Sequence, residues 1–169
     1  MSATQMQTQP VTVLGPRDGR TGQLGGLGVR FMVDAAQTAG GFSLVEHPIA
    51  PCALGAPLHR HSREDEYSYV LEGRVAVLLG DELVYGVPGD LIFKPRGEWH
   101  TFWNAADEPA RLLEIITPGG FETYFERLSA LLAGGDVCDP SALAAIAADH
   151  GLEVDVASIP RLMQEHGLR

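Results

Sequence analysis

Up to residue 117 the chain alternates short apolar runs with turn-forming residues. The run at residues 41–48 alternates apolar and polar side chains in the manner of a half-buried strand, and Gly80-Asp81-Glu82 suits a hairpin turn. The glycine-rich sequence GRTGQLGGLG, between the first two runs, predicts a loop. We therefore expect strands at residues 11–14, 28–33, 41–48, 66–73, 75–79, 83–85, 91–94, 99–105 and 110–117.

The pattern changes after Pro118, because apolar side chains then recur at helical spacing over residues 121–132. Gly134-Gly135 is expected to end that helix, and Asp139-Pro140 to begin a second one that runs to about residue 148. A third helix is expected around residues 159–166. We expect these helices to pack outside the β-structure, with a lid over a cavity mouth as the alternative.

Many short strands, with no helical run before residue 119, indicate an all-β fold of the antiparallel sandwich or barrel type. A fold of alternating strands and helices is excluded by the same observation. The predicted organisation is a disordered segment at residues 1–9, a β-barrel at residues 10–118 and a helical C-terminal extension at residues 119–169.

The charge and composition of the chain limit the kinds of partner that it is expected to bind. The chain has 169 residues and a formal net charge of −10, so nucleic acid and anionic membrane surfaces are disfavoured. No apolar run approaches the roughly 18 residues of a membrane span, and the N-terminus has no secretory signal pattern. Cys52 and Cys138 lie far apart in sequence and are expected to be reduced thiols in a cytoplasmic protein.

Three histidines and one acid are the candidate metal ligands. His59 and His61 are two residues apart, so on an extended strand both side chains point to the same face. Glu66 begins the next strand-like run, and His100 begins another one much later in the chain. Imidazole and carboxylate together suit the divalent ions of iron, manganese, nickel, cobalt, copper and zinc. We therefore expect the fold to gather these four side chains around one such ion.

Strand periodicity also predicts the neighbours of this site. Ser68 and Val70 share the face of Glu66, and Phe102 shares the face of His100. These three side chains are expected to line a substrate pocket. His47, on an earlier strand, is a further candidate for the pocket, and a satisfied or exposed strand histidine is the alternative.

The spacing of the ligands and of the glycines around them resembles the two sequence motifs of the cupins. The first motif appears here as His59, His61, Glu66 and Gly73, with Ala53 at the position of its opening glycine. The second motif appears, with no departure in spacing, as Gly89, Pro95, Gly97, His100 and Asn104. The resemblance covers residues 40–118 closely and the C-terminal segment hardly at all.

Three acids stand in a row near the expected ligand position. Glu66 fits the motif spacing both to His61 and to Gly73. Glu64 has the same strand parity but would lie further into the turn, and Asp65 would face the wrong way. Glu66 is therefore the favoured ligand, and it is also the candidate catalytic residue, because a carboxylate that leaves the metal can take a proton from an enol or hydroxyl.

The resemblance implies a jelly-roll barrel with one divalent transition metal and a small-molecule substrate. Similarity to quercetin-dioxygenase-like cupins implies an oxidoreductase that uses oxygen on an electron-rich enol or phenol. The fold hosts many reactions, so a non-oxidative isomerase, cyclase or decarboxylase, or a module that only binds a small ligand, remains an alternative. Related folds often pair by exchanging edge strands, which implies a homodimer.

Overall fold

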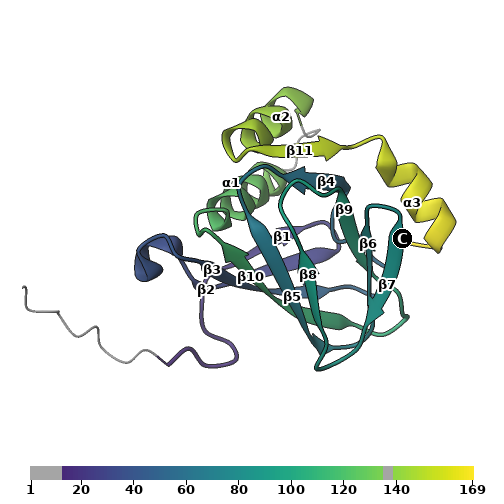
Figure 1. Ribbon diagram of the computed structural model, residues 1–169, viewed down its shortest axis with the longest axis horizontal. Helices are drawn as coiled ribbons and strands as arrows, with labels where there is room; N and C mark the ends of the chain where they lie inside the picture. The colour runs from purple at the N-terminus through teal and green to yellow at the C-terminus, as the bar shows by residue number, and fades with distance from the viewer. Residues whose placement is uncertain (1–12, 135–138) are drawn as a thin grey trace, which may run out of the picture.

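The computed structural model describes residues 13–134 and 139–169 and shows two antiparallel β-sheets packed as a sandwich, with helices outside them (Figure 1). Within these residues one sheet has six strands in the order β1-β2-β3-β10-β5-β8, and the other has five in the order β11-β4-β9-β6-β7. The expected class, an antiparallel sandwich with two or three C-terminal helices outside it, is confirmed.

Each sheet includes strands that lie far apart in the sequence. The first sheet consists of β1 (Thr21–Leu24), β2 (Leu27–Val33), β3 (Ser43–Ile49), β10 (Ala110–Thr117), β5 (Asp65–Glu72) and β8 (Leu91–Lys94). The second consists of β11 (Leu152–Asp155), β4 (Leu58–His61), β9 (His100–Asn104), β6 (Val75–Leu79) and β7 (Glu82–Gly86). A 3-10 helix spans Ala35–Thr38, and the α-helices are α1 (Glu122–Ala133), α2 (Pro140–Asp149) and α3 (Ser158–His166).

The N-terminal end of the first sheet differs from the expectation. Residues 13 and 14 lie outside any strand, while residues 11 and 12, and the segment 1–9 expected to be disordered, lie outside the described residues. The glycine-rich stretch expected to be a loop instead forms β1 and the start of β2. The physical reason is a two-residue hairpin turn at Gly25-Gly26, across which Leu24 pairs with Leu27.

Alternation along β5 determines which side chains face the interior. Ser68 and Val70 are fully buried, whereas Tyr69 between them is 38% exposed. Val70 packs with Phe102 and with apolar side chains of β6 and β10 in one core cluster, and a second cluster next to α1 contains Phe31 and Phe121. Removal of this apolar surface from water is the main force that holds the two sheets together.

The C-terminal segment contains the three expected helices and one strand that was not expected. β11 pairs with β4 along its whole length, so that Leu152 lies opposite His61 and Asp155 opposite Leu58. Figure 1 shows β11 and α2 together at the end of the sandwich where β4 lies. The strand was missed because the alternating sequence LEVD is too short to stand out between two helices.

Helix α3 covers the outer face of the second sheet. The imidazole of His166 stacks on the indole of Trp103, with ring centroids 4.2 Å apart. Trp103, at an outward position of β9, is only 2% exposed as a result. Among the described helices, none combines the length and the apolar character that crossing a membrane requires.

Candidate metal centre

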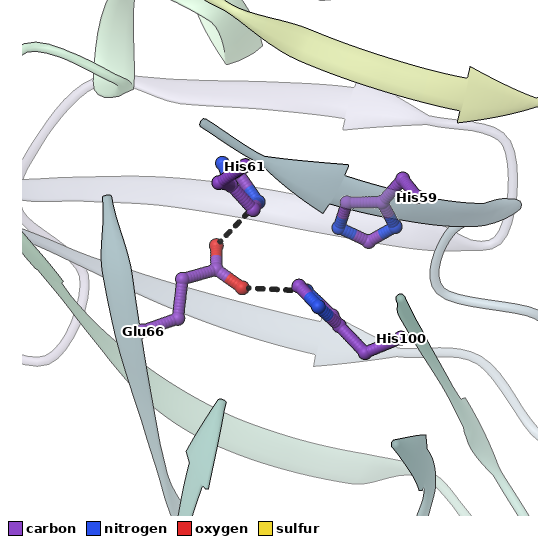
Figure 2. Close-up of side chains that lie close together, drawn as sticks. All are labelled: His59, His61, Glu66 and His100. Atoms are coloured by element: carbon purple, nitrogen blue, oxygen red, sulfur yellow. Dashed lines mark hydrogen bonds and ion pairs between the residues drawn. The ribbon is translucent and has the colours of Figure 1, made fainter. Parts of the chain in front are cut away.

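Strands from both sheets bring the four candidate ligands into the interior. β4 supplies His59 and His61, β9 supplies His100, and β5 of the facing sheet supplies Glu66. One ligand atom from each side chain lies within 4.8 Å of the others, and in Figure 2 all four side chains point toward one another. In residues 13–134 and 139–169 this is the one group of such side chains arranged to hold a metal ion.

The Nδ1 atoms of two of the imidazoles point away from the centre of the cluster. His59 Nδ1 lies 2.8 Å from the carbonyl oxygen of Pro57, and His100 Nδ1 lies 3.0 Å from that of Glu98. A carbonyl oxygen only accepts hydrogen bonds, so Nδ1 carries the hydrogen in both rings. In a neutral His59, Nε2 then presents a lone pair to the cluster.

His61 has a carboxylate on each side. Glu66 Oε1 lies 3.4 Å from His61 Nε2, and Glu64 Oε2 lies 3.5 Å from His61 Nδ1. Asp65 faces outward, and hydrogen bonds from Arg96 lower the pKa of its carboxyl to about 2. Of the three consecutive acids, the structure brings Glu66 into the cluster.

Burial and neighbouring charges determine the protonation of these groups. His59 and His100 are 7% and 1% exposed, and burial lowers the pKa of both imidazoles. Burial alone would raise the pKa of Glu66, but Lys94, His61 and His100 outweigh it and hold the pKa well below its ordinary value. Burial therefore favours the neutral form of His59, and the neighbouring positive charges favour the ionised form of Glu66.

One imidazole of the cluster has no hydrogen-bond partner. His100 Nε2 lies 3.1 Å from Glu66 Oε2, within hydrogen-bond distance. Both ring nitrogens of His61 are fully buried without a hydrogen-bond partner. Buried polar atoms are normally paired, and imidazole nitrogens with a carboxylate form a donor set that divalent transition ions accept. The residues present therefore fit such an ion.

Two charged side chains that the sequence analysis did not single out lie against the cluster. Lys94 is 1% exposed, and its Nζ lies 2.9 Å from Glu66 Oε2 and 3.1 Å from Glu114 Oε2. Burial raises the pKa of Glu114 to about 7, although Lys94 opposes the shift. Alternation along the strands could have revealed both residues. Lys94 lies on the same face of its strand as Ile92, and Glu114 lies on the same face of its strand as the buried Leu112.

The side chains expected to line a substrate pocket face the interior but are already packed there. Ser68 donates a hydrogen bond to Glu114 Oε2 at 2.8 Å. Val70 and Phe102 both belong to the first core cluster, and the ring of His47 lies 6.3 Å from that of Phe102. Their role toward a substrate stays a prediction.

Aromatic side chains of the C-terminal segment cover the outer end of the cluster. The ring centroid of Phe121 lies 4.5 Å from that of His61, and Tyr124 stacks on Phe121 at 4.8 Å. Burial raises the pKa of the Tyr124 hydroxyl to about 12, so it stays neutral. With β11 beside β4, this cover keeps bulk water away from the ligands.

His47 gives a testable pH dependence of stability. Its Nδ1 donates to the carbonyl oxygen of Gly28 at 2.9 Å, and burial lowers the pKa of the imidazole from 6.5 to about 4. Between these pH values the unfolded chain binds a proton that the folded chain does not, so folding stability falls as the pH is lowered through this window. The shift corresponds to about 3 kcal/mol.

We therefore expect the free energy of unfolding of the wild type, relative to that of His47→Gln, to fall by about 3 kcal/mol between pH 7 and pH 4. Urea denaturation of both proteins across this range measures it, and the subtraction removes the titrations that the two proteins share. Parallel curves across the range would contradict a neutral, buried imidazole at this position.

Known proteins share the fold and part of the sequence. Residues 46–116 match a protein-family model described as a cupin domain, and no curated protein matches the chain. Among solved structures, the polyketide cyclase RemF from Streptomyces resistomycificus is 29% identical, with a TM-score of 0.55, over 63% of this chain and 79% of that one. KdgF from Halomonas sp. is 21% identical, with a TM-score of 0.58, over 68% of this chain and 99% of that one. A predicted oxalate decarboxylase from Thermotoga maritima is 18% identical, with a TM-score of 0.57, over 62% and 97% of the two chains.

Proposed function

We propose that this chain, whose residues 46–116 match a cupin-domain model, is an enzyme that binds one divalent transition metal through four side chains, His59, His61, Glu66 and His100. The observation that carries the proposal is the convergence of these four buried side chains, in which both ring nitrogens of His61 have no hydrogen-bond partner. A cation at the centre would give the inward-facing nitrogen a partner.

For the reaction we favour oxidation of an electron-rich enol or phenol by oxygen, as in the quercetin-dioxygenase-like cupins that the motifs resemble. When bound, iron, manganese or copper would supply electron transfer between substrate and oxygen, whereas zinc or nickel would supply Lewis acidity. An aromatic wall supports an aromatic or enolic substrate, since Phe102 lies inside the barrel and Phe121 covers its end.

Glu66 is the residue that we propose to move a proton. Its Oε2 is held by Lys94 at 2.9 Å and by His100 at 3.1 Å, whereas Oε1 faces His61 Nε2 at 3.4 Å. Oε1 is therefore the atom that accepts the proton of a substrate hydroxyl in this proposal. The aromatic cover over the site excludes water, which would otherwise compete for that proton.

A reaction without oxygen is the second candidate, namely isomerisation, cyclisation or decarboxylation at the same site. The similarity to RemF favours it, because that protein is described as a polyketide cyclase and shares 29% of its aligned residues with this chain. Polyketides carry enolisable carbonyl groups, so the acceptor at Glu66 Oε1 serves this reaction as well.

Oxygen consumption separates the two candidates. Protein loaded with iron, manganese or nickel is mixed with a panel of flavonols and 1,3-diketones, and oxygen uptake and product are recorded in air and under anaerobic conditions. Uptake that matches product formation supports oxidation, and turnover that continues without oxygen supports the second candidate. A ligand that raises the unfolding temperature without any product identifies a module that only binds.

We also propose that the chain forms a homodimer in the cytoplasm. The outermost strands β8 and β7 of the two sheets expose apolar side chains, among them Leu91 at 58%, Phe93 at 47% and Tyr85 at 47%. Large exposed apolar groups next to unpaired strand edges favour association with a second copy. A cytoplasmic location agrees with the expectation that the cysteines are reduced thiols.

A further inference from the structure

Lys94 is a lysine inside a protein core, where such side chains are rare unless paired. It ends β8, the edge strand of the first sheet, and its side chain crosses inward rather than toward solvent, leaving the residue 1% exposed. Its ammonium lies 2.9 Å from Glu66 Oε2, 3.1 Å from Glu114 Oε2 and 5.1 Å from the ring centroid of Phe102. The fold therefore places a buried positive charge directly beside a proposed metal ligand.

This ammonium has its own support on the side away from the cluster. Glu114 Oε2 accepts from Lys94 and also from the hydroxyl of Ser68 at 2.8 Å, so the three groups form a hydrogen-bonded row between β5, β8 and β10. Both carboxylates are buried, Glu66 being 4% and Glu114 1% exposed. Because Glu114 fixes Lys94 from behind, the ammonium can hold Glu66 at a defined place.

The cluster itself needs a positive charge. The carboxylate of Glu66 is buried among three imidazoles, and an uncompensated buried carboxylate is strongly destabilising. Lys94 brings a donor and a charge to this carboxylate. A divalent ion held by Glu66 would lie close to the same ammonium, and two cations at that separation repel each other.

We propose that Lys94 is a positioning residue that acts as the counter-charge of Glu66 while no metal is bound, so that the site folds in its final arrangement before the ion arrives. Lys94 and the ion then compete for Glu66, and this part of the inference rests on the proposed metal site. Coupling between two sites is reciprocal, so removal of the ammonium both destabilises the metal-free protein and strengthens metal binding.

The test compares the wild type with Lys94→Met, which keeps a long apolar side chain but removes the charge. In the presence of a chelator, Lys94→Met is expected to unfold at a temperature lower by roughly 6–20 °C, because one partner of a buried ion pair is missing. Addition of Zn²⁺ is expected to raise the unfolding temperature of Lys94→Met by about 5 °C more than that of the wild type. The affinity for Zn²⁺, from chelator competition, is expected to rise about tenfold.

Arg30→Met is the matched control. Arg30 is also a buried cation, 8% exposed, and it pairs with Glu46 at 2.8 Å on the opposite face of the first sheet. Its removal is expected to lower the unfolding temperature while leaving the Zn²⁺-induced rise equal to that of the wild type. A structural role of Lys94 alone would make Lys94→Met behave in the same way, and this result would overturn the proposal.

A double variant keeps the test decisive even where Lys94→Met does not fold without metal. Lys94→Met/Glu66→Gln lacks both charges, so it is expected to recover most of the metal-free stability that the single variant loses. A double variant as unstable as Lys94→Met would overturn the counter-charge role. A wild type that shows no Zn²⁺-induced rise would instead contradict the metal site, while the metal-free comparison would still decide the role of Lys94.

Discussion

Protein in which His59, His61 and His100 are all replaced by alanine is expected to be purified without stoichiometric metal, whereas the wild type is expected to carry about one ion per chain. The variant keeps one ligand of the four, Glu66, and Lys94 neutralises it at 2.9 Å. A single carboxylate that already has a counter-charge has little affinity for a transition ion. Elemental analysis of protein purified from its own host measures the metal content.

The control is His166→Ala, which removes an imidazole from the outer face of the second sheet, where it stacks on Trp103. This variant is expected to keep the full metal content. Retention of one ion per chain by the triple alanine variant would show that the ion binds elsewhere, and the proposed function would lose its foundation. Equal loss from both variants would point to a general effect on folding.

Gly73→Ala is expected to reduce the free energy of unfolding by roughly 2–5 kcal/mol. Gly73 has φ of +76°, a conformation that costs an L-residue energy, and a Cβ there would lie 2.8 Å from Cα and Cβ of Ala110 and from the carbonyl oxygen of Pro109. Both the backbone conformation and the contact with a neighbouring strand therefore oppose any side chain. Urea denaturation measures the loss.

Gly89→Ala separates these two causes. Gly89 has φ of +100°, but a Cβ there would meet nothing within 4 Å. Only the conformational cost remains, about 1–2 kcal/mol. Equal losses for the two variants would mean that the close approach of Ala110 to Gly73 has no energetic weight.

The sequence predicted those features of the fold that depend on residues close together in the chain. The alternation of buried and exposed side chains along β5 placed Glu66, Ser68 and Val70 on one inward face, as observed. The spacing of His59 and His61 predicted a shared face in the same way. The convergence of His100 with that pair is not local, and it was indicated by the ligand chemistry of the side chains and by the motif resemblance.

Features that depend on pairing between distant segments were missed. β11 has no signal of its own, because its four residues are stabilised by pairing with β4 rather than by their propensity. β1 was hidden by its glycines, which in the fold serve the hairpin turn to β2. Lys94 and Glu114 could be assigned to inward positions from parity, but their mutual pairing needs the register of β5 with both β8 and β10.

The strand that completes the edge of β4 has a consequence for biosynthesis. β4 pairs with β9 at one position, where His59 lies opposite His100, whereas it pairs with β11 at four positions. A ribosome adds about 5–20 residues per second, so several seconds separate the synthesis of His61 from that of Leu152. Until Leu152 is made, the outer edge of β4, which carries His59 and His61, lacks the strand that pairs with it in the finished fold.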